Sequence, residues 1–277
     1  MADTQKIYLG NNLFNNMALG DDMVSSLYAD ITPATLFIDA AGITDTTQQL
    51  AIDNLYNDLY TNNLWDKFYA LWPLVGGTST THQYNLVDTS TRNLTFSGTW
   101  VHNSSGITGN GTNTYANTNV NLNGLPTAFS TGGVGVYTST SGKDNYDMGC
   151  FRVGNEQYGI ITRYNIDSSP AISLHAADGV TALNNSDGSG FYVGQASSTD
   201  TGIYKDGSAL ATGSYDGSQF APSRDLYLGA LNENGIASNF TSRTYSLSFI
   251  ADAFTAAQIS TLYTIVQDYQ TTLGREV

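Results

Sequence analysis

The 277-residue chain has few charged residues, and basic ones are the scarcest. Lys and Arg number 10 against 24 Asp and Glu, which gives a formal net charge of −14. Nucleic-acid binding depends on clustered Lys and Arg that neutralise phosphates, and the sequence contains no such cluster. The negative field of the chain would also repel an anionic membrane surface. We therefore expect no nucleic-acid partner and no attachment to a membrane.

Cysteine and long apolar runs are also scarce. Cys150 is the only cysteine, so the chain can form neither an internal disulfide nor a cysteine-rich metal site. The N-terminus lacks the charged and apolar regions of a secretory signal, and no stretch approaches the roughly 20 apolar residues of a membrane span. We expect a protein that is made in the cytoplasm without a signal peptide and is not inserted in a membrane.

Gly, Ser, Thr, Asn and Tyr take the place of the missing charges. Thr and Tyr favour strands, while Gly, Asn and Ser favour turns, so this mixture is typical of many short strands. The same residues solvate a surface without charge, as in proteins that meet the outside world. A virus particle combines such a surface with the absence of an export signal, because its parts are made in the host cytoplasm and released by lysis.

A six-residue unit occurs twice near the N-terminus, at residues 9–14 and 19–24. Each copy is typical of a short apolar strand, a Gly-polar turn and a second apolar strand. Hairpins this small are only marginally stable alone. We interpret residues 1–30 as an anchor segment that docks through four apolar side chains: Leu9, Leu13, Leu19 and Met23. The alternative is a flexible tail in which the similarity is due to chance.

Helical patterns fill residues 31–72. Asp45 and Gln48 have the spacing of a capping box, and apolar residues follow at helical spacing: Ile52, Leu55 and Leu59. A second short helix, ending before Pro73, is predicted from Leu64, Phe68 and Leu71. This pair of helices carries no chemistry, and we expect it to pack against the rest of the fold or against a neighbouring subunit.

The chain ends in another predicted helix, within residues 255–277. Thr255 and Gln258 form a capping box, and Gly274 follows the last apolar residue as a C-terminal stop. One apolar stripe runs along it: Ile259, Leu262, Val266, Tyr269 and Leu273. We expect this stripe to pack on the domain formed by the preceding residues.

Short strands and frequent turns occupy residues 73–254. Ile203 and Tyr204 lead into a turn at residues 205–208, which predicts a hairpin. Later, three apolar residues alternate with two serines, which predicts a strand with one apolar and one polar side: Tyr245, Leu247 and Phe249 with Ser246 and Ser248. Many short strands at close spacing are typical of a β-sandwich or barrel.

Several of these segments resemble, in order and spacing, the strands of concanavalin A-like, laminin-G-like domains: residues 72–77, 94–98, 202–207, 225–229 and 245–250. Residues 254–263 are similar to the short helix that often follows those strands. The resemblance covers residues 71–263. It implies a mainly β fold, a concanavalin A-like antiparallel β-sandwich (jelly roll) with an N-terminal helical segment and a C-terminal helix.

A second resemblance concerns the ends of the chain. The Leu-Gly repeat and three further segments look like virion proteins of tailed bacteriophages: residues 42–44, 75–78 and 271–275. This resemblance implies a location in a virion, where residues 1–30 would contact other virion proteins.

Candidate catalytic residues are few. Laminarinase-type glycoside hydrolases that share the fold carry a Glu-x-Asp-x-x-Glu run, and the three glutamates of this chain, Glu156, Glu233 and Glu276, belong to no such run. We therefore expect no enzymatic activity. His82, His102 and His175 lie far apart without metal-ligand spacing, so we expect a hydrogen-bonded structural role for His82. Cys150 is expected to be a small buried side chain.

One loop is a candidate metal site. Laminin-G-like domains often bind one calcium ion near the rim of the sandwich, and the resemblance implies such a site at the oxygen cluster of Asp144, Asn145 and Asp147. The alternative is a polar loop closed by Gly142 and Gly149. No other cofactor is expected.

Two functional hypotheses follow. The first is a non-enzymatic bacteriophage virion structural protein, a fibre, tail or capsid-decoration subunit, which forms a homo-oligomer and displays a lectin-like sandwich for attachment or for binding a host-surface glycan. Exposed aromatic side chains would stack on sugar rings, while Asn and Asp bind their hydroxyls. The alternative is a free carbohydrate-binding module or a glycanase acting on host polysaccharide.

Overall fold

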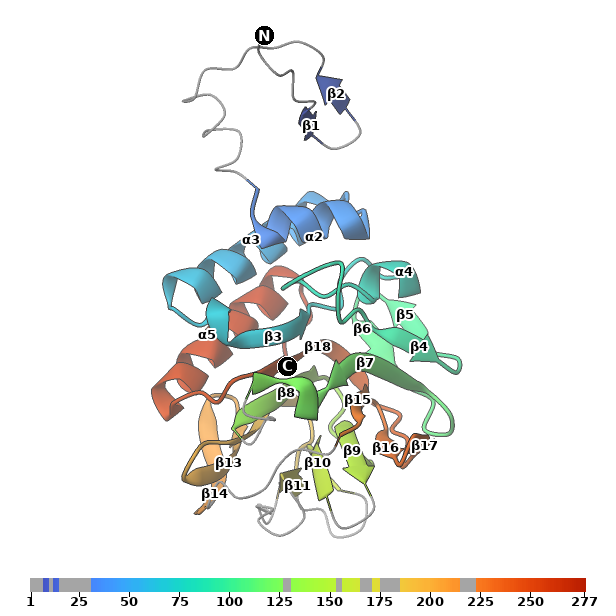
Figure 1. The fold of residues 1–277 in the computed structure, drawn as a ribbon, viewed down its shortest axis with the longest axis vertical. Helices are drawn as coiled ribbons and strands as arrows, with labels where there is room; N and C mark the ends of the chain where they lie inside the picture. The colour runs from blue at the N-terminus through green and yellow to red at the C-terminus, as the bar shows by residue number, and fades with distance from the viewer. Residues whose placement is uncertain are drawn as a thin grey trace.

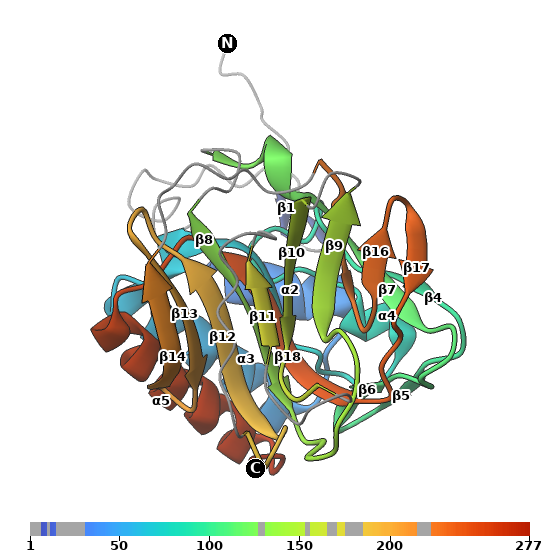
Figure 2. The ribbon, with the colours of Figure 1, turned by 90° about the horizontal axis from the view of Figure 1, so that it is seen from below.

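The computed structural model describes residues 7–9, 12–14, 31–126, 131–152, 156–164, 171–174, 185–214 and 223–277. Two β-sheets lie face to face, and helices cover the far side of one of them (Figures 1 and 2). This is the mainly β sandwich with N-terminal helices and a C-terminal helix that the sequence predicts. In the described part of the chain, no helix is both long and apolar enough to cross a membrane.

The sheet beneath the helices is called here the helix-side sheet. Its strands, in spatial order, are β14 (Ser208–Ser214), β13 (Asp200–Lys205), β12 (Gly190–Ala196), β8 (Gly132–Thr138), β18 (Thr244–Ala251), β6 (Gly106–Thr108) and β5 (Val101–Asn103), with β3 (Phe68–Trp72) also paired to β18. Every residue of β8 and β12 is buried. These strands are buried because the helices cover one face of this sheet and the second sheet covers the other.

The second sheet is called here the outer sheet. Its strands, in spatial order, are β11 (Ala171–Leu174), β10 (Glu156–Ile161), β9 (Met148–Arg152), β15 (Asp225–Leu228), β7 (Tyr115–Asn121) and β4 (Thr95–Ser97). A hairpin of β16 (Leu231–Glu233) and β17 (Ile236–Ser238) extends from it, and β16 runs parallel to β9. All other pairings in this sheet are antiparallel.

Two hydrophobic cores hold the layers together. The core between the sheets contains large side chains from both, including Trp72, Tyr245, Met148, Tyr158 and Leu226. The second core lies between the helix-side sheet and the helices, and includes Phe37, Leu55, Phe249, Leu262 and Val266. Full burial of each such side chain is worth roughly 1.5–3 kcal/mol. The helices are therefore an integral layer of the fold.

The helical layer consists of α2 (Pro33–Ala41), α3 (Thr46–Thr61) and α5 (Ala256–Thr272), while α4 (Ser79–His82) and the 3-10 turns η1 (Trp65–Lys67) and η2 (Leu122–Gly124) lie in connections. Two predicted caps are confirmed. Asp45 accepts a hydrogen bond from the Gln48 N–H, and Thr255 forms a complete capping box with Gln258. α2 lies within the segment predicted to be helical, although its start was not predicted: Thr32 is the cap, and Pro33 follows at the first helical position, where proline is favoured.

The predicted second short helix over Leu64, Phe68 and Leu71 is wrong. The segment forms η1 and then β3, which pairs with β18. A register shift in this pairing places Phe68 and Leu71, three residues apart, in the same core against the helices. A β-bulge therefore produced the three-residue spacing that resembles a helix.

The polar side predicted for β18 is not exposed to solvent. Ser246 and Ser248 are buried, because the sandwich core lies against the side of β18 that faces away from the helices. Ser248 Oγ satisfies its hydrogen bond by donating to the Gly135 carbonyl at 3.1 Å.

Two predicted hairpins are present. β13 and β14 are joined through Asp206 and Gly207, both with positive φ, as a type I′ turn requires. Near the N-terminus, β1 (Ile7–Leu9) pairs with β2 (Asn12–Phe14), so the first repeat unit forms a hairpin. Leu9 and Leu13 belong to these strands, whereas Leu19 and Met23 lie outside the described residues. The anchor role of all four, and the division at residues 30, 72 and 254, stay predictions.

Candidate functional site

The outer sheet has one face against the sandwich core and one face directed away from it, called here the outer face. Met148 and Cys150 of β9 enter the core, so Gly149 between them faces outward. Leu226 and Leu228 of β15 enter the core in the same way. Asp225 and Tyr227 are therefore on the outer face, beside Gly149.

Two tyrosines stack on this outer face. Tyr115 of β7 and Tyr227 of β15 have ring centroids 4.5 Å apart and an angle of 22° between their planes. Tyr115 is partly exposed, and Tyr227 beside it keeps 8% of its surface exposed. The pair fixes two aromatic rings in nearly parallel orientation, with little side-chain entropy left to lose on binding a ligand.

A third tyrosine lies across two glycines of the outer face. A β-carbon added at Gly149 would lie 2.8 Å from Tyr146 Cδ1, and one added at Gly159 would lie 3.3 Å from it. The absence of side chains there lets the Tyr146 ring lie close to the sheet, and Gln157 Nε2 donates to its hydroxyl. Tyr115, Tyr146 and Tyr227 are called here the tyrosine platform.

Polar groups border the platform. Asn117 Nδ2 donates to Asp225 Oδ2 at 3.1 Å. Glu233 is paired with Phe151 of β9 and faces outward with it, and its carboxylate accepts from Ser238 Oγ. Amide and carboxylate groups beside aromatic rings are a combination that binds sugar hydroxyls while the rings cover an apolar sugar face.

The hydroxyls of Tyr146 and Tyr227 stay protonated near neutral pH. Burial raises the pKa of Tyr227, and Tyr115 and Asp225 raise it further. Burial also raises the pKa of Tyr146. The hydrogen bond from Gln157 lowers this pKa, while Tyr164 and Glu233 raise it further. Each hydroxyl can therefore both donate and accept a hydrogen bond.

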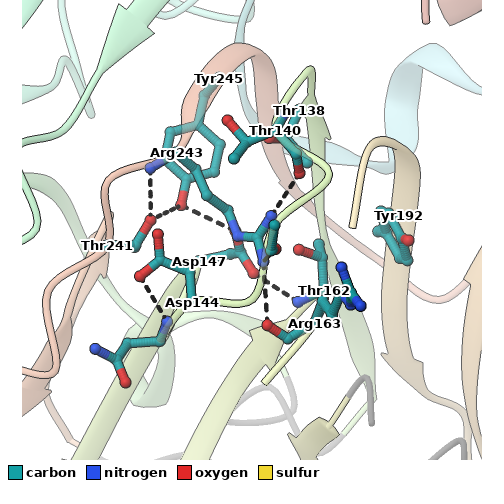
Figure 3. Close-up of polar contacts among 12 residues, drawn as sticks. Thr138, Thr140, Asp144, Asp147, Thr162, Arg163, Tyr192, Thr241, Arg243 and Tyr245 are labelled. Carbon is teal, nitrogen blue, oxygen red and sulfur yellow. Dashed lines mark hydrogen bonds and ion pairs between the residues drawn. The ribbon is translucent and has the colours of Figure 1, made fainter. Parts of the chain in front are cut away.

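Asp147, a predicted calcium ligand, binds protein groups instead (Figure 3). Its Oδ1 accepts from the Tyr245 hydroxyl at 2.9 Å and lies 3.0 Å from Arg243 Nε. Its Oδ2 accepts from the Thr162 N–H at 2.6 Å. Asp147 and Arg243 have no exposed side-chain surface, and their contact is an ion pair rather than an aligned hydrogen bond. Burial raises the pKa of Asp147, opposed by Arg243 and by the Thr162 N–H.

Arg243 joins separate segments of the chain through backbone carbonyls. Its Nη1 donates to Thr140 O at 2.7 Å, and its Nη2 donates to Gly142 O at 2.8 Å and Arg163 O at 3.1 Å (Figure 3). A buried cation needs such acceptors, because desolvation otherwise costs several kcal/mol. The pair thus fixes the loop that precedes β9.

The other two predicted calcium ligands bind the segment before β18. Asp144 Oδ2 accepts from the Ser242 N–H and Oγ, each at 2.8 Å, and Asn145 Nδ2 donates to Phe240 O at 3.0 Å. Within the described residues, no group of three or more His, Cys, Asp or Glu has the arrangement of a metal site. A cation at Asp147 would have to replace Arg243. Calcium binding at Asp144, Asn145 and Asp147 stays a prediction.

These contacts also position Tyr146, which stands between Asn145 and Asp147 in the chain. The Asp147 N–H donates to Ile160 O at 3.0 Å, and the Gly229 N–H donates to Asp147 O at 2.7 Å. Hydrogen bonds thus fix the backbone of Asp147 as well as its side chain. The buried network consequently fixes the start of β9 and, with it, the ring that lies on the outer face.

Two histidines that are distant in sequence meet elsewhere in the fold. The Gly77 N–H donates to His82 Nε2 at 3.1 Å, so the proton of neutral His82 is on Nδ1, which lies 3.0 Å from His102 Nδ1. Burial, together with the nearby His102 and Arg275, lowers the pKa of His82 to about 3. The expected hydrogen-bonded role of His82 agrees with this geometry. His175 lies outside the described residues.

Cys150 is buried in the core between the sheets, and burial raises the pKa of its thiol. Its environment is that of an inert apolar side chain, as the sequence predicts.

None of the platform tyrosines was predicted from the sequence as a site residue. One signal was present around Tyr227, where Asp225 and Tyr227 alternate with two leucines in the sequence. The pairing of Tyr227 with Tyr115 arises only when β7 and β15 become neighbours, and Tyr146 lies outside any strand.

Comparison with known proteins gives no family assignment: no family model matches the chain, and no curated protein does. Solved structures with a similar fold include domain 4 of the arabinanase AbnA from Geobacillus stearothermophilus, in complex with arabinotriose. It is 11% identical, with a TM-score of 0.44, and the match covers 71% of this chain and 98% of that domain.

Two further structures come from sialidases. The CBM40 of the Ruminococcus gnavus IT-sialidase is 12% identical, with a TM-score of 0.39 and coverage of 50% of this chain and 84% of that chain. The leech intramolecular trans-sialidase is 15% identical, with a TM-score of 0.37 and coverage of 50% and 24%. At this identity and these TM-scores, the likeness carries no argument about what this chain binds.

Proposed function

We propose that the protein binds a glycan on the tyrosine platform. The observation that carries the proposal is the arrangement of Tyr115, Tyr146 and Tyr227 on the outer face, with Asn117 and Asp225 at its border. Tyr115, stacked on Tyr227, and Tyr146, lying on a glycine floor, are partly exposed and present aromatic surface, and the adjacent amide and carboxylate supply hydrogen bonds. This is the chemistry that a sugar ring, apolar on one face and hydroxylated at its edge, requires.

The proposed activity is binding without cleavage. Glycoside hydrolysis needs two carboxyl groups on either side of one bond. The three glutamates occur on separate elements: Glu156 begins β10, Glu233 ends β16 and Glu276 follows α5. The missing Glu-x-Asp-x-x-Glu run supports a protein that holds a glycan and does not cut it.

Binding to a panel of immobilised glycans tests the proposal. Tyr115→Ala and Tyr146→Ala should each weaken binding by about 1–2 kcal/mol, or about 5–30-fold in Kd, as for aromatic residues central to an interface. Tyr60→Ala is the matched control, because Tyr60 is 61% exposed on α3, in the helical layer. Equal loss in all three variants, or no binding by the unaltered protein, would overturn the proposal.

A role in a bacteriophage virion is the finer proposal, and it rests on the resemblance of the chain ends to tailed-phage virion proteins. In that setting the segment before residue 31 attaches a homo-oligomer to other virion proteins, and the sandwich faces outward. A chain lacking residues 1–30 should then stay folded but fail to join the particle. Immunoelectron microscopy of intact particles tests this directly. A protein found free of particles would favour the alternative of a free carbohydrate-binding module.

A further inference from the structure

We propose that the tyrosine platform selects neutral glycans and rejects those that carry carboxylates, such as uronates and sialates. The inference rests on the proposed function and concerns the charge of the ligand. It is carried by two carboxylates, Asp225 and Glu233, that border the platform on neighbouring elements of the outer sheet.

Strand register places both carboxylates beside the tyrosine rings. Asp225 is two residues before Tyr227 on β15 and therefore shares its face. Leu231 of β16 lies over Gly149 together with Tyr146, since a β-carbon there would be 3.0 Å from Leu231 Cδ1. Glu233, two residues after Leu231, faces outward in the same way. A ligand on the platform therefore lies between two negative groups.

The fields of these carboxylates reach the rings themselves. Asp225 contributes to the raised pKa of Tyr227, and Glu233 contributes to the raised pKa of Tyr146. In neither case does a Lys or Arg among the described residues contribute. A carboxylate on the ligand would meet the same two fields without an opposing cation, and like charges brought together at an interface oppose binding.

The nearest basic residue in the chain does not offset this field. Arg224 immediately precedes β15, and its Nε is buried. Its Nη1 donates to the Ser223 carbonyl at 3.0 Å. Arg224 contributes to the pKa of neither Tyr146 nor Tyr227.

Matched oligosaccharides test the inference. Methyl-esterified oligogalacturonide and its de-esterified form share one sugar chain, and the methyl ester removes the negative charge of each carboxylate. The unaltered protein should prefer the neutral member of a bound pair by about tenfold or more at low salt. Added salt should narrow this preference, because the Debye length falls to about 8 Å at 0.15 M.

Charge-removing variants identify the residues responsible. Asp225→Asn with Glu233→Gln should reduce the preference to about threefold or less and abolish its salt dependence. Asp268→Asn with Asp58→Asn is the matched control. These aspartates lie exposed on α5 and α3, and their replacement removes two negative charges, as in the test variant. The control should keep the full preference.

Each result distinguishes the two proposals. Tighter binding of the carboxylated member would overturn the charge selection while leaving glycan binding intact. An unchanged preference in the Asp225 and Glu233 variant would overturn the role of these two residues. Binding to no glycan of either charge would overturn the proposed function itself, and the inference with it.

Discussion

Asp147 and Arg243 form a fully buried ion pair, with Oδ1 3.0 Å from Nε, between the loop before β9 and the segment before β18. The carboxylate also binds Tyr245 and the Thr162 N–H, and the guanidinium binds three backbone carbonyls. The two sheets of the sandwich are thereby joined at one end by polar contacts. The same contacts hold the backbone next to Tyr146, so the stability of the sandwich and the shape of its outer face depend on one network.

Removal of one partner of this pair should be costly. Arg243→Met leaves Asp147 buried without its cation, and such changes cost about 3–5 kcal/mol. The free energy of unfolding in urea measures the loss. Arg243→Met combined with Asp147→Asn should lose less than Arg243→Met alone, because no unpaired charge remains. Lys143→Met, at an exposed position in the same loop, should change stability by no more than about 0.5 kcal/mol. A small loss in Arg243→Met would show that the pair is not structural.

The glycine beneath the platform gives a second prediction. Gly149→Ala should weaken glycan binding, because its β-carbon would lie 2.8 Å from Tyr146 Cδ1 and 3.0 Å from Leu231 Cδ1. Displacement of the ring by a few tenths of an ångström should cost about 1 kcal/mol of binding, or about fivefold in Kd. Isothermal titration with a bound glycan measures it. Gly124→Ala is the control, since no atom lies within 4 Å of its added carbon. Equal affinity for the glycan in both variants would show that the position of the Tyr146 ring does not affect binding.

Stability should fall in acid through His82. Its folded pKa of about 3 lies below the ordinary value of 6.5, so the unfolded chain binds the proton more readily between these values. The stabilisation is therefore complete above pH 6.5 and is lost as the pH falls toward 3, by at most about 1.4 kcal/mol per pH unit. Urea titrations of the native protein and His82→Gln should show a shallower slope in the variant between pH 4 and 6.5. Identical slopes would contradict this assignment.

Calcium removal should leave the melting temperature unchanged. A ligand that binds only the folded state raises its stability by mass action, and Asp147 already has Arg243, Tyr245 and the Thr162 N–H as partners. Thermal unfolding with and without a chelator measures the effect. A melting temperature that falls with chelator and returns with added calcium would support the site predicted at Asp144, Asn145 and Asp147.

Local signals in the sequence predicted the elements that depend on local contacts. The caps at Asp45 and Thr255 bind residues three positions away, and the Asp206-Gly207 turn needs only its own backbone angles. β3 was mistaken for a helix because its bulge placed Phe68 and Leu71 on one face. That face exists only once β3 is paired with β18, which follows much later in the chain.

The candidate site was less accessible to prediction, since its parts meet only in the folded chain. The spacing of Asp144, Asn145 and Asp147 suggested a cation, yet the buried cation nearest to Asp147 is Arg243. The alternation around Tyr227 distinguished two faces of β15 without showing which one the core would cover.

The central claim is that glycans bind at the tyrosine platform. Amide chemical shifts of the isotope-labelled protein, followed during titration with a neutral glycan selected from the panel, test it most directly. The largest changes should occur at Tyr115, Tyr146, Tyr227 and their neighbours on β7, β9 and β15, while the helical layer stays unchanged. Changes centred on α3, α5 or β14 instead would contradict the account.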